Sequence, residues 1–344
     1  MSNAPLLALL GRATCENRGA IEAGLESKWR IEEWKPGDDE TRISEILREA
    51  VAVIPGGDAL MTRGVLAAFS DAPELKFLQL PFTGYEWVDF AQLPKGLVVA
   101  NAYGHEVAMA EFAIGAMLQW EKDYCTLDRT FRAGSWKYRA VGINDFAQGE
   151  LYGKTIGIVG YGTIAREIAK RAAAFDMNLL AVSRSERECP EGFSWYGTME
   201  RLHDLLDQSD YVALTCELND ETRGLINTPE FDVMGAETTL INVARGPIVD
   251  EDALHAALKA KTIRGAILDV WYQYPSGSPP NPEEGGIAPS RLDFAGLDNV
   301  LMTPHCSGNT DGTNVRRCLG MANNLNLVAQ GKRPATFIGE GTKG

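Results

Sequence analysis

The sequence predicts an α/β protein with two domains, each built around a parallel β-sheet. A chain of 344 residues, 45% of them hydrophobic, would form an unusually large single core, so two domains are expected. Short apolar runs alternate with helical stretches along most of the chain, which is typical of parallel sheets. Residues 155–184 read as strand, glycine turn, helix and strand, which is one complete βαβ unit.

The first hundred residues supply the elements of the first domain. The predicted strands there are Pro5–Leu10, Val51–Ile54, Leu75–Leu80 and Val98–Ala102. The predicted helices include Asp39–Glu49 and Thr62–Phe69. The long apolar stretch Glu106–Lys122 predicts a buried helix that links the domains, and the aromatic-rich segment Tyr124–Gln148 predicts an arm that packs on another surface, such as a second subunit.

The second domain continues in regular alternation after residue 184. Its further strands are predicted at Tyr211–Cys216, Thr239–Asn242, Ala266–Val270 and Asn299–Thr303. Its intervening helices are predicted at Met199–Leu206, Asn227–Val233 and Asp250–Lys259. Tyr274–Pro289, rich in proline and glycine, reads as a long loop, and loops of that length are often functional. Asn309–Gln330 predicts a closing helix that returns to the first domain, so the expected division is 1–102 plus 309–344 against 103–308.

The glycine turn gives the first indication of a ligand. Gly160 allows a tight turn, and Gly162 lacks a side chain, so a pyrophosphate can approach the backbone at the helix N-terminus. Ala165 is the small third residue that lets the helix pack on the strand. In this strand–turn–helix context the motif predicts a dinucleotide-binding, Rossmann-like domain.

Composition excludes several other classes of protein. Lys and Arg number 33 against 47 Asp and Glu, a net charge of −14, which disfavours binding to nucleic acid or an anionic membrane. The six cysteines include no CxxC pair, so neither a metal site nor a disulfide framework is expected, and a reducing cytoplasm fits best. The chain has no apolar run of 18 residues, so no membrane span is predicted.

Motifs between residues 136 and 308 carry a family resemblance. They are Trp136 with ELYGKT at 150–155, GYGTIA at 160–165, DET at 220–222 with LIN at 225–227, INVARGPIVDEDAL at 241–254, GAILDVW at 265–271 and TPHCSG at 303–308. In this order and spacing the chain resembles the D-isomer-specific 2-hydroxyacid dehydrogenases, which include glyoxylate/hydroxypyruvate reductases, phosphoglycerate dehydrogenases and formate dehydrogenases. The resemblance implies two Rossmann-like domains with a cleft between them, the first of them substrate-binding.

Two residues are the main catalytic candidates. Arg245 follows a predicted strand, at the end where open α/β sheets bind ligands. Its guanidinium can hold a carboxylate bidentately and polarise an adjacent carbonyl, which is the role that the resemblance implies. His305 follows the last predicted strand, and its imidazole can protonate an alkoxide as hydride arrives or take the proton back. The resemblance implies the same acid–base role.

Tyr274 marks a departure from the family pattern. Most members have a Glu at this position, which pairs with the catalytic His and raises its pKa. A phenol can hydrogen-bond to imidazole but brings no charge at neutral pH. Four explanations stay open. In the first three, the His–Tyr pair works at a lower pH optimum, the substrate needs little proton transfer, or Glu283 or Glu284 of the long loop substitutes. A catalytically weakened protein is the fourth.

The resemblance also implies binding residues outside this catalytic group. The first-domain turn Phe82, Thr83 and Gly84 would hold the substrate carboxylate through its backbone, with His105 as a further substrate contact or a helix cap. Asp269 would hydrogen-bond the nicotinamide carboxamide. The remaining cofactor-binding residues, besides the two turn glycines and His305, are expected to be Thr163, Ile164, Cys216, Val243 and Ala244.

The end of the second strand of the βαβ unit predicts which cofactor is used. NAD-binding units carry an acid there for the ribose 2′-hydroxyl. Here the run is Ser183, Arg184 and Ser185, with Arg187 close by. A 2′-phosphate needs a cation and hydroxyl donors, so NADP is expected, with NAD possible if Arg184 only stacks on adenine.

Together these features predict an NADPH-dependent 2-ketoacid reductase acting on a small 2-ketoacid or D-2-hydroxyacid. The alternatives are a formate-dehydrogenase-like enzyme, because formate dehydrogenases also have a neutral partner for the His, and a cofactor-sensing co-repressor with little or no turnover. A homodimer is expected by resemblance, with Tyr124–Gln148 as the arm.

Overall fold

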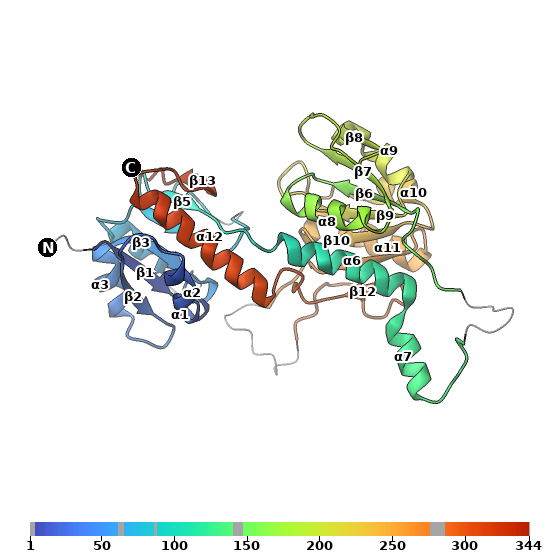
Figure 1. The fold of residues 1–344 in the computed structure, drawn as a ribbon, viewed down its shortest axis with the longest axis horizontal. Coiled ribbons are helices and arrows are strands. Elements are labelled where there is room, and N and C mark those ends of the chain that lie inside the picture. Colours follow the sequence, from blue (N-terminus) through green and yellow to red (C-terminus); the bar gives the residue numbers. More distant parts are fainter. Residues whose placement is uncertain (1–3, 61–64, 86–87, 140–146, 276–285, 344) are drawn as a thin grey trace. The chain divides into compact units, whose positions relative to one another are not determined.

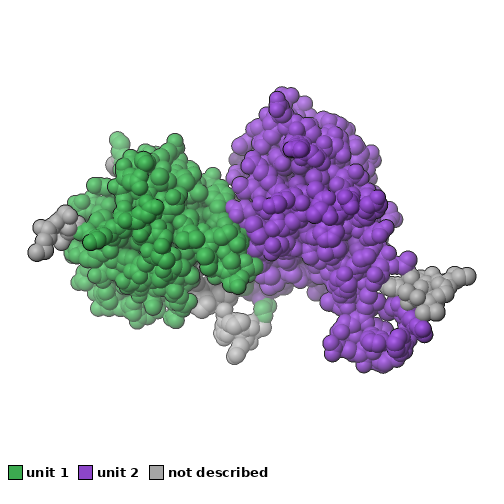
Figure 2. Space-filling view, in the orientation of Figure 1, with its two compact units in different colours: residues 1–105, 275–286, 309–344 green, residues 106–274, 287–308 purple. Residues whose placement is uncertain are grey.

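The computed structural model describes residues 4–60, 65–85, 88–139, 147–275 and 286–343 of the chain (Figure 1). The chain divides into two compact units, coloured separately in Figure 2. Unit 1 comprises Met1–His105, Pro275–Gly286 and Asn309–Gly344, and unit 2 comprises Glu106–Tyr274 and Ile287–Gly308.

Unit 1 contains a six-stranded sheet in the order β13-β5-β4-β3-β1-β2. Its strands are parallel except for β13, which runs antiparallel to β5. The strands are β1 (Leu6–Leu10), β2 (Arg30–Trp34), β3 (Ala50–Pro55), β4 (Phe77–Gln79), β5 (Val98–Ala100) and β13 (Phe337–Glu340). The helices are α1 (Arg12–Glu16), α2 (Arg18–Ala23), α3 (Thr41–Glu49), α4 (Gly57–Leu60), α5 (Val65–Ala68) and α12 (Asp311–Ala329), with a 3₁₀ turn at Phe69–Asp71.

Unit 2 contains a seven-stranded, wholly parallel sheet in the order β12-β11-β10-β9-β6-β7-β8. The strands are β6 (Thr155–Val159), β7 (Asn178–Ser183), β8 (Trp195–Thr198), β9 (Tyr211–Leu214), β10 (Thr239–Asn242), β11 (Gly265–Leu268) and β12 (Val300–Met302). The helices are α6 (Glu106–Lys122), α7 (Tyr124–Arg132), α8 (Thr163–Ala173), α9 (Leu202–Asp207), α10 (Thr228–Met234) and α11 (Glu251–Ala260), with 3₁₀ turns at Met199–Arg201 and Gly246–Ile248.

Each sheet is covered on both faces, which explains the continuous apolar runs of its central strands. In unit 2, α6 and α8 pack on one face, and α9, α10 and α11 pack on the other (Figure 1). In unit 1, α3 and α5 lie over one face, while α2 and α12 lie over the other. The predicted α/β class with two parallel sheets is therefore confirmed.

Several elements escaped the sequence prediction. Strand β2 reads Arg-Ile-Glu-Glu-Trp and lies at the edge of its sheet, where polar side chains replace the apolar run that marks a central strand. The edge strands β8 (WYGT) and β13 (FIGE) have only four residues each, one of them a glycine, so they too lack the apolar run of a central strand. The segment expected as an arm begins with helix α7, and the first residues of the helix expected at Thr62–Phe69 lie outside the described residues. No helix in the described ranges is long and apolar enough to cross a membrane.

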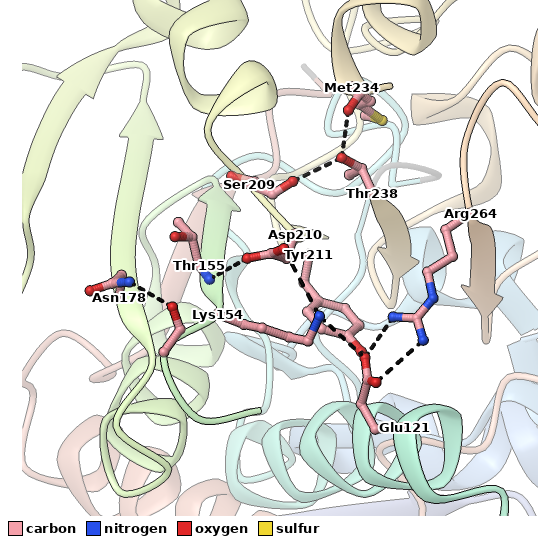
Figure 3. Close-up of polar contacts among 11 residues, drawn as sticks. Glu121, Lys154, Thr155, Asn178, Ser209, Asp210, Tyr211, Met234, Thr238 and Arg264 are labelled. Carbon is pink, nitrogen blue, oxygen red and sulfur yellow. Dashed lines mark hydrogen bonds and ion pairs between the residues drawn. The ribbon is translucent and has the colours of Figure 1, made fainter. Parts of the chain in front are cut away.

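A buried carboxylate secures α6 to the sheet of unit 2 (Figure 3). The Glu121 side chain, 2% exposed, lies at the end of α6. Arg264 donates to it from Nη1 to Oε1 at 2.6 Å and from Nη2 to Oε2 at 3.3 Å, and the Tyr211 hydroxyl donates to Oε1. The Lys154 ammonium lies 3.8 Å from the same oxygen. These partners stand at the amino-terminal ends of β11, β9 and β6.

Glu121 also contacts the segment through which the chain, after leaving α6, returns to the sheet of unit 2. The Gly149 amide donates to the Glu121 carbonyl at 3.1 Å. A Cβ at position 149 would stand 1.6 Å from Glu121 Oε2, so only glycine allows this approach. Burial alone would raise the pKa of the Glu121 carboxyl, but the hydrogen bonds from Arg264 and Tyr211 and the charges of Arg264 and Lys154 lower it below the ordinary 4.5.

Replacing Glu121 by Gln should therefore destabilise the protein. The variant leaves Arg264 without its carboxylate and Lys154 with Asp210 alone, 4.0 Å away, and we expect the free energy of unfolding to fall by about 2–3 kcal/mol. This is less than for a fully enclosed pair, because the Arg264 side chain is 31% exposed. Since the pKa of Glu121 is lower folded than unfolded, its stabilisation is complete above about pH 4.5 and is lost as pH falls through the folded pKa. Urea unfolding at pH 7 and pH 4 measures both effects.

The matched control is Glu111→Gln, which removes a carboxylate that is 63% exposed and 3.4 Å from Arg171. We expect this change to cost at most about 0.5 kcal/mol at either pH. An equal cost for the two variants would contradict the structural role given to Glu121.

Candidate functional site

Three adjacent strands of unit 2 bring the predicted catalytic residues to one edge of the sheet. Strands β10, β11 and β12 pair in parallel, so their carboxyl ends meet at the same edge. Arg245 follows β10, Asp269 follows β11 and His305 follows β12. Ligands of open α/β sheets bind at this edge.

The Asp269 carboxylate organises the loop that carries His305. It is fully buried, and it accepts from Thr303 Oγ1 at 2.6 Å and from the amides of Cys306 and Ser307 at 2.9 Å each. Between these donors His305 adopts a left-handed conformation with φ 56°, which few non-glycine residues adopt. The three hydrogen bonds hold this backbone in place, and His305 remains partly exposed at the surface of the unit.

Tyr274 lies against His305, with 5.6 Å between the ring centres and the planes tilted by 55°. Its hydroxyl oxygen accepts from the Trp271 amide at 3.0 Å. The Trp271 indole in turn donates to the Thr303 carbonyl at 2.8 Å, which braces the His305 loop from a second side. The Trp271 amide thus holds the Tyr274 hydroxyl, and the uncharged ring of Tyr274 lies beside the imidazole of His305.

This environment favours neutral imidazole. Partial burial lowers the pKa of His305 below the ordinary 6.5; the carboxylate of Asp269 opposes this effect, and the guanidinium of Arg245 adds to it. Burial likewise raises the pKa of the Tyr274 phenol, which stays protonated near neutral pH. No carboxylate stands in the Tyr274 position to hold the proton on His305.

The backbone before Arg245 is fixed by a buried amide. Asn242, 1% exposed, accepts from the Ala244 amide at 3.1 Å and donates to the Arg245 carbonyl at 3.0 Å. Val243 and Ala244 are buried in this turn. Arg245 itself is half-buried and donates from Nη1 to the Ala244 carbonyl at 2.8 Å. A guanidinium presents five N–H donors in a fixed planar arrangement, which matches the geometry of a carboxylate.

The glycine turn has the geometry that a pyrophosphate requires. Gly160 has φ 92°, and a Cβ there would lie 2.6 Å from the backbone of Cys216 at the end of the neighbouring strand. A Cβ at Gly162 would meet nothing within 4 Å, so the space over the turn is open. Helix α8 starts at Thr163 with no side-chain cap and no acid in its first turn, which leaves its amides for an anion, while Ile164 packs beneath. These residues fit a dinucleotide.

The end of β7 carries hydroxyls and a cation in place of an acid. Ser183 is buried, and its hydroxyl contacts the Tyr196 hydroxyl and donates to the Ser185 carbonyl at 3.3 Å. The Tyr196 hydroxyl also donates to the Ser185 carbonyl, at 2.6 Å. Arg184 is exposed. The last residue of β7 is thus a serine and not the acid that would repel a 2′-phosphate, although the Ser183 hydroxyl is hydrogen-bonded within the protein.

The predicted substrate residues of unit 1 form a group of their own. The Thr83 hydroxyl donates to the Ala102 carbonyl at 2.7 Å and lies 3.3 Å from His105 Nδ1. His105 is 8% exposed and stacks on Tyr103. Phe82 packs against the core of the unit, so its side chain supports the turn that continues into Gly84.

Some residues of the site were not anticipated from the sequence. Thr303 and Trp271 belong to the sequence motifs, but their hydrogen bonds to Asp269 and to the His305 loop depend on the pairing of β11 with β12. Tyr196 belongs to an unpredicted edge strand. Glu283 and Glu284, considered as substitutes for a catalytic carboxylate, lie outside the described residues.

With this geometry established, comparison with known proteins identifies the class. Residues 114–307 match the model of the D-isomer specific 2-hydroxyacid dehydrogenase NAD binding domain. The chain is 34% identical to a glyoxylate reductase of Pyrococcus horikoshii over 322 residues, covering 91% of each chain. The protein therefore belongs to the D-isomer specific 2-hydroxyacid dehydrogenase family, as the resemblance implied. A glyoxylate/hydroxypyruvate reductase of Arabidopsis thaliana is 29% identical over 327 residues, 94% of this chain and 97% of the relative.

Solved structures confirm the fold over the whole chain. A family member from Aeromonas salmonicida superposes with a TM-score of 0.80 at 23% identity, covering 98% of this chain and 99% of the other. An NADPH-dependent glyoxylate/hydroxypyruvate reductase from Sinorhizobium meliloti, solved with citrate, gives a TM-score of 0.71 at 23% identity, covering 98% of each chain. At these identities the likeness concerns the fold alone.

Proposed function

We propose that the protein is an NADPH-dependent reductase of small 2-ketoacids, of the glyoxylate and hydroxypyruvate class. The observation that supports this most is the meeting of Arg245, Asp269 and His305 at the ends of three adjacent parallel strands. The glyoxylate reductases among the relatives, 34% identical in the case of Pyrococcus horikoshii, support the substrate class. The absence of an acid at the end of β7 supports NADP as the preferred cofactor, with NAD as a second cofactor that binds more weakly.

Each residue has a defined task in this proposal. Arg245 binds the 2-ketoacid carboxylate and polarises the carbonyl next to it. The Asp269 carboxylate would hold the carboxamide of a bound nicotinamide, the group that would supply hydride for the carbonyl carbon. His305, as imidazolium, gives its proton to the carbonyl oxygen and becomes neutral imidazole. Tyr274 excludes water from one side of the imidazole without adding charge.

Unit 1 is the substrate-binding domain in this proposal, and unit 2 holds the cofactor. The turn at Phe82, Thr83 and Gly84 would contribute backbone amides to the substrate carboxylate, with His105 beside it. The hydrogen bond of Thr83 to Ala102 supports a fixed turn, which binding through backbone amides requires.

We expect the purified protein to oxidise NADPH in the presence of glyoxylate or hydroxypyruvate. The fall in absorbance of the reduced nicotinamide measures this reaction. His305→Gln removes the proton donor, and we expect kcat to fall roughly 10²- to 10⁴-fold while NADPH binding is kept. The matched control is His203→Gln, which changes an exposed histidine paired with Glu230 at 3.0 Å and should leave kcat unchanged.

Two outcomes would overturn this proposal. One is tight NADPH binding with no turnover of any small 2-ketoacid between about pH 5 and pH 8, the range in which His titrates, which would favour a cofactor-sensing binding protein. The other is an equal loss of kcat in the two histidine variants.

A homodimer formed through the arm is a second part of the proposal. Helix α7 has no buried residue, and Tyr124, Phe131 and Trp136 are 55%, 57% and 65% exposed. Phe131 and Trp136 meet edge to face with ring centres 5.0 Å apart. An apolar surface of this kind is typical of a subunit contact.

The free thiols of all six cysteines support a reducing compartment, the cytoplasm, as the location of the protein in this proposal.

Light scattering after size-exclusion chromatography tests the dimer. We expect twice the chain mass for the wild-type protein and a shift towards the monomer for Trp136→Ser, because the change removes the largest exposed aromatic side chain of the arm. Val315→Ser on α12, at 54% exposure, is the control and should not change the mass. A monomeric wild-type protein would contradict this part of the proposal.

A further inference from the structure

A network of buried amide side chains lies at the carboxyl ends of two strands of unit 1. Strands β4 and β5 pair in parallel, so Gln79, the last residue of β4, and Asn101, which follows β5, stand at the same edge of the sheet. Asn324 of α12 completes the network, and the three residues are 0%, 1% and 1% exposed. Since ligands of parallel α/β sheets bind at this edge, the buried amides stand at a candidate ligand site.

The amide network ends on the turn assigned to the substrate. Asn324 donates from Nδ2 to Gln79 Oε1 at 2.7 Å, and Gln79 donates from Nε2 to the Asn101 carbonyl at 2.9 Å. Asn101 donates from Nδ2 to the Thr83 carbonyl at 2.8 Å. The Thr336 hydroxyl also donates to the Asn101 carbonyl, and the Asn101 amide donates to the Thr336 carbonyl at 3.1 Å. The polar groups of Asn101 are therefore engaged, with one exception.

The exception is the side-chain oxygen of Asn101, which is buried and accepts no hydrogen bond from the described residues. The reverse orientation of the amide would set this oxygen against the Thr83 carbonyl oxygen, so the contact with Thr83 fixes the orientation. An unpaired buried acceptor destabilises a protein, so this amide must supply something that an apolar residue would not. The donor to the Thr83 carbonyl is what it supplies.

Fixing a carbonyl also fixes the direction of the next amide. A trans peptide is planar, and its C=O and N–H point in opposite directions. Asn101 holds the Thr83 carbonyl, so the Gly84 N–H is directed away from Asn101. In the same way the Ala102 amide donates to the Phe82 carbonyl at 3.1 Å, which directs the Thr83 N–H. Among the described residues neither N–H donates to a protein group, so both are available to a carboxylate.

We infer that Asn101 is a positioning residue for the substrate, because the carbonyl that it holds directs the Gly84 amide toward the substrate carboxylate. This inference rests on the proposed function, which assigns the turn to the substrate. Asn101 is buried and acts only through the peptide that joins Thr83 to Gly84. Gln79 and Asn324 support it from the side of the sheet and of α12.

Calorimetric titration of the NADPH-loaded protein with oxamate tests this inference without turnover. Oxamate has a carboxylate next to a carbonyl, as a 2-ketoacid does, but it is not reduced. For Asn101→Ala we expect the Kd of oxamate to rise roughly 10-fold, because one hydrogen bond to the carboxylate is misdirected, and the Kd of NADPH to stay unchanged. The KM for glyoxylate should rise by a similar factor, with kcat within about threefold of wild type, because Arg245 and His305 are untouched.

Asn299→Ala is the matched control. Asn299 is 9% exposed, donates from Nδ2 to the Leu258 carbonyl at 3.1 Å and likewise has an unpaired buried side-chain oxygen. It precedes β12, however, and so stands at the amino-terminal ends of the strands of unit 2. Both alanine variants should unfold at a lower urea concentration than the wild-type protein, but only Asn101→Ala should weaken oxamate binding. Asn101→Ser removes the same donor with a smaller loss of polarity and should also raise the Kd of oxamate, which keeps the test available if Asn101→Ala does not fold.

The inference is overturned if the position-101 variants bind oxamate as the wild-type protein does, or if Asn299→Ala weakens oxamate binding equally. Either result would leave the proposed reductase activity intact. A wild-type protein that binds NADPH but neither binds oxamate nor reduces glyoxylate would instead contradict the proposed function itself.

Discussion

The buried carboxylate of Asp269 is the contact on which the candidate catalytic site depends. Its three hydrogen bonds to Thr303, Cys306 and Ser307 fix a loop whose central residue, His305, has a left-handed backbone. Backbone conformations of this kind cost of order 1–3 kcal/mol and persist only where the surroundings determine them. Without the carboxylate, three donors would lose their acceptor, and the imidazole would lose both its position and its nearest negative charge.

The uncharged ring of Tyr274 beside His305 then determines the pH range in which the imidazole carries a proton. The phenol oxygen accepts from the Trp271 amide, so the tyrosine contacts His305 through its ring. A protein with a carboxylate in this place would hold the imidazole protonated at higher pH. Among the described residues, the carboxylate of Asp269 acts to raise the pKa of His305, but the opposite effect of burial is larger. The site therefore favours proton donation in mildly acidic conditions.

Much of the fold and of the candidate site can be predicted from the sequence, because the signals that indicate them are local. The glycine turn, the strand ends at Arg245 and His305 and the alternating apolar runs each depend on a few neighbouring residues. The edge strand β2 could not be found in this way, since its polar residues lack the apolar signal. The orientation of the Tyr274 hydroxyl could not be found either, because it depends on how the chain turns back after β11.

The same limit applies to the substrate turn. Its residues follow one another in the sequence, but the donor that holds the Thr83 carbonyl comes from Asn101, and the amides behind Asn101 come from β4 and α12. Spacing in the sequence gives no sign that Asn101 and Thr83 meet. Side chains from three separate segments form this network, and only the packed sheet brings them together.

The pH dependence of kcat/KM for 2-ketoacid reduction, compared between the wild-type protein and Tyr274→Glu, tests the central claim most directly. Reduction needs the imidazolium, so the rate should fall as pH rises through the pKa of His305, which lies below 6.5 in the wild-type protein. A carboxylate at position 274 favours the charged form, and we expect the fall to move upward by about one pH unit or more. Superimposable profiles, or a downward shift, would contradict the account.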